Sequence, residues 1–362
     1  MTQVSDTFVA PAATMRAVQL TAWERPAEVC DVPRRAPGPG EVLLRVDAAG
    51  LCHSDLHLMH WPAGSLAYEL PFTLGHEVAG TVLELGPGAT GVEVGEPVIV
   101  YGPWGCGVCP SCSRGSEHLC ERRTMTPGGG CGLGRDGGLA EQLVVPSPRL
   151  LVPLGELDPV AAASLADAGL TTYHAIRRAL SLLVPGSSAV VIGVGGLGHV
   201  AVQLLRALSP ARVVVVDTRE DALELGLRCG AHVSLAAEDA TPDALRRAAG
   251  GPIALVLDCV GVDATLALAG QAVSPGGHLS MIGMGGGALS MRLGSVPMET
   301  TVVISNWGTR AELADVLALA AAGAVEVEVE RVALEDVPAA YARLDAGDVR
   351  GRLVAVPGEA GR

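Results

Sequence analysis

The chain has 362 residues and a formal net charge of −14, with 39 acidic residues against 25 basic ones, all of them arginine. Such an acidic chain lacks the basic face that binds nucleic acid or an anionic membrane, so we expect neither partner and predict a small-molecule ligand. No apolar run reaches the roughly 18 residues of a membrane span. The N-terminus has no signal-peptide pattern, and we therefore expect a cytoplasmic protein.

Residues 15–150 predict a mostly-β domain with long loops. Short apolar runs at 41–49, 77–86 and 96–101 have the alternation of strands, and glycine and proline separate them. The pattern changes near residue 168, where apolar strands begin to alternate with helical segments. The strands are expected at 188–193, 211–217, 253–261, 276–283 and 300–307. Such alternation predicts an α/β fold with a doubly wound parallel sheet covered on both faces.

Four cysteines lie within fifteen residues of a glycine-containing loop, spaced by two, two and seven residues. Thiolates at such spacings are typical of a structural zinc site that fixes a loop without a core of its own. An iron–sulfur cluster is a second option, and a group of unrelated core cysteines is a third. The predicted ligands are Cys106, Cys109, Cys112 and Cys120.

Asp167 is the only carboxylate in the alanine-rich segment 159–176. Burial of an unpaired carboxylate costs several kcal/mol, which predicts a cation or metal partner. Cys52, in AGLCHSDLH, and His76, in LGHEVAG, would supply a thiolate and an imidazole. With Asp167 they would bind a catalytic zinc ion, leave its fourth position open and balance its charge. The alternative is that Asp167 only caps or begins the following helix.

The segment VVIGVGGLGHV carries a G-x-G-x-x-G pattern between a strand and a helix, with Gly193, Gly195 and Gly198 as its glycines. This context predicts a dinucleotide site, in which the glycines allow a tight turn, approach of the pyrophosphate and close helix packing. Asp217, at the end of the next strand, would hold the ribose hydroxyls and favour NAD over NADP. Arg219 slightly weakens that inference.

Together these motifs resemble the zinc-dependent medium-chain alcohol dehydrogenase family. The resemblance implies a GroES-like catalytic domain of residues 1–166 and 306–362, interrupted by a Rossmann NAD-binding domain of residues 167–305. It implies two zinc ions per subunit, one catalytic and one structural, with the ligand sets named above. It also implies that Glu77 neighbours the catalytic zinc and ligates it transiently.

The resemblance further implies a proton relay from Ser54 through the cofactor ribose to His57, and an orienting role of Asp55 toward His76. The reaction would proceed through a zinc alkoxide and hydride transfer to the nicotinamide. Further NAD contacts are expected from six residues, namely His53, Gly196, Leu197, Val260, Gly283 and Arg352.

Four aromatic residues fall near the substrate-pocket positions of the resembled family, with ordinary core packing as their alternative: Trp61, Tyr68, Trp104 and Trp307. Apolar rings beside zinc favour secondary and some primary alcohols, and their ketones or aldehydes, as substrates. A polyol, threonine or formaldehyde-type enzyme of the same family, or a non-catalytic NAD-binding zinc protein, is the alternative. The resemblance also implies a homo-oligomer, with a tetramer favoured over a dimer.

Overall fold

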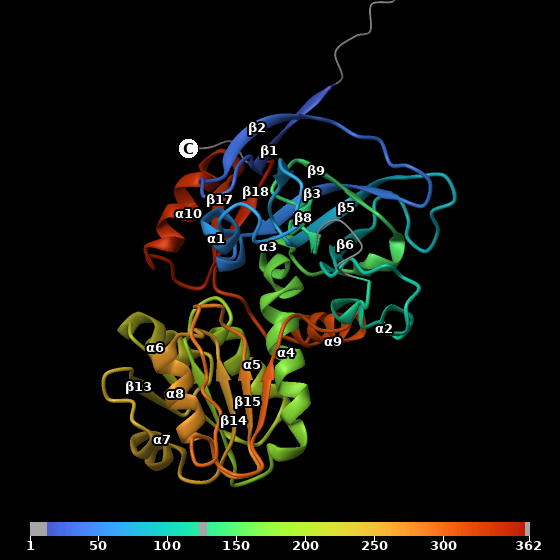
Figure 1. The fold of residues 1–362 in the computed structure, drawn as a ribbon. Helices are drawn as coiled ribbons and strands as arrows, with labels where there is room; N and C mark the ends of the chain where they lie inside the picture. The colour runs from blue at the N-terminus through green and yellow to red at the C-terminus, as the bar shows by residue number, and fades with distance from the viewer. Residues whose placement is uncertain (1–12, 123–128, 359–362) are drawn as a thin grey trace, which may run out of the picture.

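The computed structural model describes residues 13–122 and 129–358. The chain forms a β-rich lobe and a second lobe of parallel strands flanked by helices, which meet near α4 and α9 (Figure 1). The ends of the expected catalytic domain, residues 1–12 and 359–362, lie outside the described residues. Within the described ranges, no helix is both long and apolar enough to cross a membrane.

The β-rich lobe is built on a seven-stranded sheet with the order β10-β6-β5-β3-β18-β17, in which β9 also pairs with β3. The bounds are β3 Val42–Gly50, β5 Glu77–Leu85, β6 Pro97–Val100, β9 Gln142–Val145, β10 Leu151–Pro153, β17 Val329–Ala333 and β18 Arg352–Val356. Because β18 pairs antiparallel with β3, the C-terminal segment returns to the first sheet. Most residues of β3 and β6 and the first half of β5 are buried, and Leu44, Val78 and Ile99 are fully buried in the core.

Smaller elements complete this lobe. A three-stranded sheet contains β1 Thr14–Leu20, β2 Glu28–Pro33 and β4 Phe72–Thr73, and a two-stranded one contains β7 Gly130–Cys131 and β8 Gly134–Arg135. The helices are α1 His53–His60, α2 Pro110–Ser113, α3 Pro159–Ala162 and α10 Val337–Asp345.

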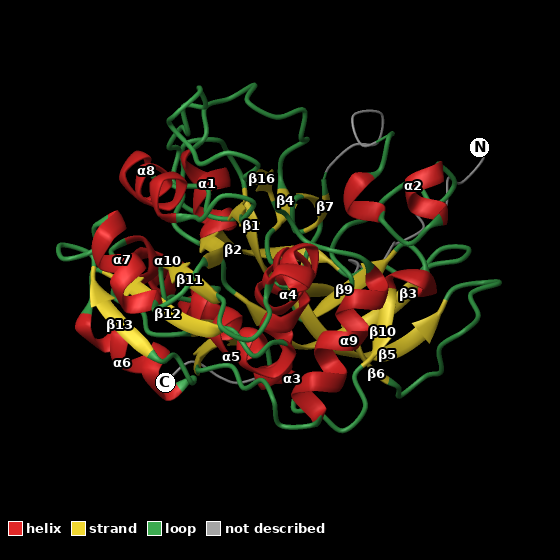
Figure 2. Cartoon of the chain, turned by 90° about the horizontal axis from the view of Figure 1, so that it is seen from below, coloured by secondary structure: helices red, strands yellow, loops and turns green. Residues whose placement is uncertain are grey.

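The second lobe holds a six-stranded parallel sheet with the order β13-β12-β11-β14-β15-β16, which confirms the predicted α/β class. Its strands are β11 Ser188–Ile192, β12 Arg212–Asp217, β13 Val233–Ala236, β14 Ile253–Asp258, β15 His278–Met281 and β16 Thr301–Ile304. The helices around it are α4 Ala168–Ala179, α5 Gly198–Leu208, α6 Glu220–Arg228, α7 Pro242–Ala249 and α8 Asp263–Ala272 (Figure 2). The helix α9, Arg310–Ala321, packs against α4 and β10. The central strands are near-continuous runs of buried Val, Leu and Ile because helices cover both faces.

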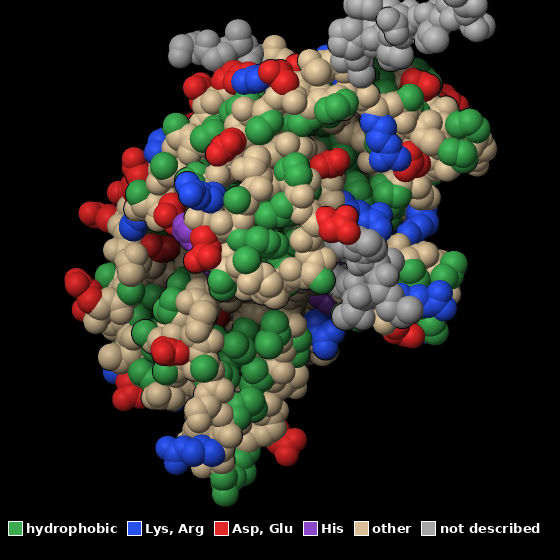
Figure 3. Space-filling view, turned by 45° about the horizontal axis from the view of Figure 1, so that its top comes forward, with side chains coloured by type: hydrophobic (Ala, Val, Ile, Leu, Met, Phe, Trp, Pro, Cys, Tyr) green, Lys and Arg blue, Asp and Glu red, His purple; other side chains and the backbone are tan. Residues whose placement is uncertain are grey.

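Acidic and basic side chains are interspersed with hydrophobic ones on the face that Figure 3 shows. Exposed large hydrophobic residues concentrate in one segment, residues 284–304, which leads into and includes the edge strand β16. They are Met284, Met291, Leu293, Met298 and Ile304, with exposed fractions between 52% and 94%.

Candidate functional site

Four ionisable side chains from distant parts of the chain meet at one buried point. Cys52, His76, Glu77 and Asp167 each place one ligand atom so that these atoms all lie within 4.8 Å of one another. The Sγ of Cys52 is 3.8 Å from Oδ2 of Asp167, and Nε2 of His76 is 3.5 Å from the same oxygen. The structure thus brings the three predicted ligands together, with Glu77 beside them.

This donor set fits a zinc ion. Tetrahedral zinc, with zinc–ligand distances of about 2.0 to 2.3 Å, separates sulfur, nitrogen and oxygen ligands by about 3.3 to 3.6 Å. The two separations from Asp167 Oδ2, 3.8 Å to the Cys52 sulfur and 3.5 Å to His76 Nε2, are close to these values. The buried Nε2 of His76 faces the same side as the Cys52 sulfur and Asp167 Oδ2, from which it could bind the metal in its neutral form.

Asp55 fixes the position of both Cys52 and His76. Its Oδ1 lies 3.2 Å from Nδ1 of His76, and its Oδ2 accepts hydrogen bonds from the Cys52 N–H at 3.0 Å and the Tyr341 hydroxyl at 2.8 Å. Burial opposes protonation of His76, but the charge of Asp55 and the hydrogen bonds to Asp167, Asp55 and Cys52 together outweigh burial, and the His76 pKa lies well above the usual value. A metal ion at Nε2 would therefore release a proton on binding.

Asp167 occupies the N-cap position of α4, yet its side chain makes no capping hydrogen bond. Instead Oδ1 accepts a hydrogen bond from the Thr171 hydroxyl at 2.7 Å, while Oδ2 is directed toward Cys52 and His76. The capping alternative therefore accounts for the position of the residue but not for the direction of its carboxylate. Burial raises the pKa of Asp167, but the hydrogen bond and charge of His76, the Thr171 hydroxyl and the charge of Arg352 together outweigh burial and lower the pKa overall.

Glu77, at the start of β5, forms an ion pair with Arg352, at the start of β18, and both side chains are almost completely buried. Burial raises the pKa of Glu77 to about 7, against the opposing charge of Arg352. The Nε of Arg352 also lies 3.4 Å from the Ser164 hydroxyl. Arg352 thus contacts a residue of the candidate metal site, a partner that the sequence did not indicate.

The four cysteines of the loop after β6 form a second candidate metal centre. The Cys106 and Cys112 sulfurs are 3.9 Å apart, and those of Cys109 and Cys120 are 4.0 Å apart. Tetrahedral zinc with four thiolates separates its ligands by about 3.8 Å, so the set fits this ion. The Cys112 N–H donates to Cys109 Sγ and is the main reason why the Cys109 pKa falls to about 6.

An ion pair joins the cysteine loop to Arg149, just before β10. Arg149 Nη1 lies 2.6 Å from Oε1 of the buried Glu117, and Nη2 donates to the Gly105 carbonyl at 2.8 Å. The loop between these contacts contains only the short helix α2 and one 3-10 turn. A metal bound by the four cysteines would add to the cohesion of this loop.

The glycine motif lies where β11 ends and α5 begins. Gly193 has a φ of 86°, which favours glycine. A Cβ at Gly198 would lie 1.9 Å from the Gly193 carbonyl oxygen, whereas one at Gly195 would meet open space. The loop thus leaves room for a ligand beside Gly195, at the N-terminus of α5, as a pyrophosphate requires. A Cβ at Gly196 would instead contact Arg352, 2.6 Å away at Cδ.

The neighbouring strands of the sheet end at the same edge. Asp217, the last residue of β12, accepts hydrogen bonds from the Val194 N–H at 2.7 Å and the Arg219 N–H at 3.0 Å. The Arg219 guanidinium donates to the Gly347 carbonyl at 2.8 Å. Val260 and Gly283 follow β14 and β15, and a Cβ at Gly283 would lie 2.2 Å from the Val260 backbone.

The residues expected in the relay lie on α1, which begins directly after Cys52. Ser54 is half-buried, with its Oγ 3.6 Å from the Cys52 sulfur, and His53 is exposed. The half-buried His57 stacks on Trp61, with ring centroids 6.5 Å apart. The Leu197 backbone is the N-cap of α5.

The predicted pocket aromatics have different surroundings. The buried Trp307 ring lies 5.9 Å from the His76 ring, between centroids. Tyr68 packs against Phe72 and Trp23, and Trp104 is buried in the core of the β-rich lobe. Trp307 is therefore the predicted pocket residue that the structure places against a candidate metal ligand.

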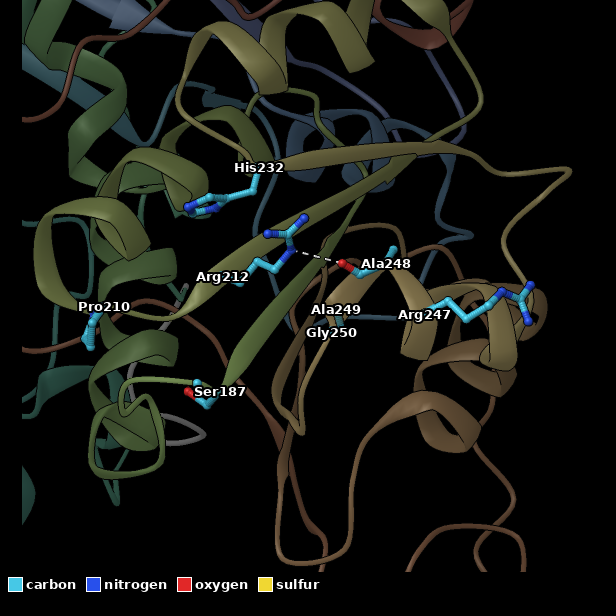
Figure 4. Close-up of a pocket in the computed structure, with 9 residues that line it drawn as sticks. Ser187, Pro210, Arg212, His232, Arg247, Ala248, Ala249 and Gly250 are labelled. Atoms are coloured by element: carbon cyan, nitrogen blue, oxygen red, sulfur yellow. Dashed lines mark hydrogen bonds between the residues drawn. The ribbon is translucent and has the colours of Figure 1, made fainter.

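A surface hollow of about 450 Å³ lies at the opposite edge of the parallel sheet (Figure 4). Residues at the starts of β11 and β12 form part of its lining. Among them, Arg212 donates a hydrogen bond from Nε to the Ala248 carbonyl at 3.0 Å. Its lining contains neither a cysteine nor a carboxylate. The hollow therefore lies away from both candidate metal centres and from the glycine motif.

Family models, curated relatives and solved structures all match this chain to the same family. Residues 38–156 match the alcohol dehydrogenase GroES-like domain, and residues 196–322 match the zinc-binding dehydrogenase family. The chain is 34% identical to an NAD-dependent alcohol dehydrogenase of Sulfurisphaera tokodaii, over 95% of this chain and 100% of the relative. It is 32% identical to D-arabinose 1-dehydrogenase (NADP(+)) of Saccharolobus solfataricus, over 94% and 97%.

Among solved structures, acetophenone reductase from Geotrichum candidum in complex with NAD matches with a TM-score of 0.82 and 32% identity, over 95% of this chain and 97% of that one. The chain belongs to the zinc-containing medium-chain alcohol dehydrogenase family, as the resemblance predicted. Its activity is that of an NAD-dependent alcohol dehydrogenase, and its two candidate zinc sites are those described above.

Proposed function

We propose that this enzyme interconverts secondary alcohols and ketones, and accepts some primary alcohols and aldehydes. The observation that carries this proposal is the buried Trp307 ring beside His76. An apolar ring next to the reacting carbon favours a hydrophobic substituent, whereas a polyol or sugar needs polar partners for its additional hydroxyls. The similarity to an acetophenone reductase supports a ketone, and the similarity to a D-arabinose dehydrogenase supports the sugar alternative.

When bound, zinc would polarise the substrate oxygen and NAD would accept the hydride. In our proposal Cys52, His76 and Asp167 hold the metal, and Asp55 keeps the imidazole in the required orientation through Nδ1. The Ser54 hydroxyl, near the Cys52 sulfur, takes the alcohol proton, and His57 passes it to solvent.

The glycine motif, with Gly193, Gly195 and Gly198, would hold the pyrophosphate in our proposal. The other NAD contacts proposed come from both lobes: His53, Gly196, Leu197, Asp217, Arg219, Val260, Gly283 and Arg352.

The substrate class is tested by kcat/KM values for 1-phenylethanol, 2-butanol, sorbitol, threonine and D-arabinose with NAD. We expect the two secondary alcohols to be the best substrates and Trp307→Ala to lower their kcat/KM values. A preference for D-arabinose or sorbitol would contradict the proposed class while leaving the family unchanged. Ser54→Ala should lower kcat far more than NAD affinity, and unchanged turnover would eliminate the relay.

The ligand role of Asp167 is tested by metal content. Asp167→Asn keeps the size of the side chain but removes a charge, and we expect it to lose one zinc per subunit. The zinc of Cys106, Cys109, Cys112 and Cys120 should remain. A variant that keeps both metals and full activity would contradict the role.

We further propose that the enzyme is a homo-oligomer, a tetramer rather than a dimer, and that β16 contributes one interface. This edge strand carries no charge over Thr301–Ile304, and Ile304 is 81% exposed. An open strand edge can pair with its own copy about a twofold axis. Light scattering should therefore give a smaller particle for Ile304→Arg than for Val94→Arg, a matched change at an exposed turn. Equal masses would contradict the interface.

A further inference from the structure

We propose that Thr171 is a positioning residue for Asp167, and that the backbone of Trp307 sets the direction of its hydroxyl. The Thr171 Oγ1 lies 2.7 Å from Oδ1 of Asp167 and 3.0 Å from the Trp307 nitrogen. Both contacts are buried, and they join α4 to the segment between β16 and α9. The proposal rests on Asp167 being a zinc ligand.

Which group donates each of these hydrogen bonds follows from which atoms carry a hydrogen. A backbone N–H can only donate, so the Trp307 N–H must give its hydrogen to Thr171 Oγ1. The single hydroxyl hydrogen of Thr171 is then free to be donated to the carboxylate of Asp167. Such a hydrogen bond to an ionised oxygen is stronger than one between neutral groups. The Trp307 amide thus orients the threonine, and the threonine holds one carboxylate oxygen.

The result is a carboxylate whose two oxygens have different roles. Oδ1 is engaged by Thr171, and Oδ2 faces the Cys52 sulfur at 3.8 Å and His76 Nε2 at 3.5 Å. A thiolate ligand offers one sulfur atom, but a free carboxylate can turn and bind through either oxygen or both. A fixed Oδ1 removes that freedom and leaves one oxygen for the metal.

Trp307 is itself firmly held. Its φ is 57°, in a region that is unfavourable for a tryptophan, and its side chain is buried. A Cβ at Gly102 would lie 1.9 Å from the indole ring, so the ring fills the space beside that glycine. The same residue therefore contacts His76 through its ring and reaches Asp167 through Thr171.

The chain offers a matched control in the adjacent residue. Thr172 is equally buried on α4, but its hydroxyl donates to the Ala168 carbonyl at 2.6 Å rather than to Asp167. Thr171→Val and Thr172→Val thus remove the same atom group from neighbouring positions of one helix. Thr171→Ser keeps the hydroxyl and removes only a methyl group.

The experiment measures zinc per subunit while free zinc is lowered with a chelator, so that the four-cysteine site serves as an internal reference. We expect Thr171→Val to bind zinc about 10- to 100-fold more weakly at the Asp167 site, as for other residues that support a metal ligand. Thr171→Ser and Thr172→Val should keep near wild-type affinity at both sites.

Wild-type affinity in Thr171→Val would overturn the proposal. So would a Thr171→Ser variant that loses zinc as readily as Thr171→Val, because the hydroxyl would then be irrelevant. Wild-type protein that binds zinc only at the four-cysteine site would contradict the proposed catalytic metal itself, and with it this role. If the wild type binds two zinc ions and Thr171→Val binds zinc at the Asp167 site with the same affinity, only the positioning role of Thr171 is contradicted.

Discussion

The Arg352 guanidinium and the Glu77 carboxylate form an ion pair in which Glu77 is fully buried and Arg352 is only 5% exposed. The two residues begin strands of one sheet, β18 and β5, and Glu77 is next to His76 in the chain. A buried charge is tolerated only when it is paired, because removal from water costs several kcal/mol per ion. The candidate metal site therefore lies beside a buried charge pair whose partners depend on each other.

Arg352→Met should destabilise the protein by about 3 to 5 kcal/mol, because it leaves Glu77 buried without a partner. The Glu77 pKa is already raised to about 7 by burial, and loss of the cation should raise it further. Folded Arg352→Met would then keep the Glu77 proton to a higher pH than the folded wild type, whereas both unfolded chains lose it below pH 6. The loss of stability caused by the substitution should therefore grow from pH 6 to pH 8. Urea unfolding at the two pH values measures the change.

Two controls accompany this prediction. Arg343→Met breaks an exposed pair with Glu330 and should cost at most about 1 kcal/mol. The double variant Glu77→Gln, Arg352→Met removes both charges and should recover part of the lost stability. A single Arg352→Met variant as stable as Arg343→Met would show that the pair has no structural role.

Asp217→Ala should lower the ratio of kcat/KM for NAD to that for NADP by about 10-fold or more, since hydrogen bonds to a charged group contribute roughly 1.5 to 3 kcal/mol. Asp217 lies at the end of β12 and accepts the Val194 N–H, so it also fixes the glycine loop. Asp221, whose carboxylate lies 3.6 Å from Arg219 and which is partly exposed, provides the control Asp221→Ala. An unchanged ratio in Asp217→Ala would argue against a ribose contact.

Cys120→Ser should lose the structural zinc but retain the metal at Cys52, His76 and Asp167. With few other contacts, the cysteine loop should then open locally, and trypsin should cleave after Arg114 faster than in the wild type. Zinc content and the rate of cleavage measure the two effects. Cys30→Ser, at a half-buried cysteine outside both clusters, should change neither. Slow cleavage in a variant without the structural zinc would mean that the loop holds itself.

The sequence was sufficient to predict the parallel sheet and the grouping of the candidate metal ligands, because burial and ligand chemistry constrain both. Apolar strands that alternate with helices require a sheet covered on both faces, and the parallel sheet was correctly predicted. A thiolate, an imidazole and an isolated carboxylate are unusual enough to be noticed, and the structure brings Cys52, His76 and Asp167 together although 115 positions separate the first from the last.

The residues that support the site could not be found in this way. Tyr341 and Thr171 are ordinary residues of helices, and nothing in their spacing indicates that their hydroxyls face Asp55 and Asp167. Their roles arise from how α10 and α4 pack, which depends on contacts between distant segments. For Thr171, the i to i+4 spacing from Asp167 on a predicted helix was the one usable signal.

Glu312→Gln should destabilise the protein at pH 7 by ~3 kcal/mol. Partial burial opposes ionisation of Glu312, but the hydrogen bonds from His174 and from the Thr309 N–H outweigh it and lower the pKa from 4.5 to about 2. A depressed pKa of this kind contributes stability above pH 4.5, which is lost as the pH falls toward 2. The difference between variant and wild type should therefore shrink below pH 4.5 in urea unfolding. Glu84→Gln, at an exposed strand position, should show no such trend, and a constant difference for Glu312→Gln would mean that its charge does not stabilise the α4–α9 contact.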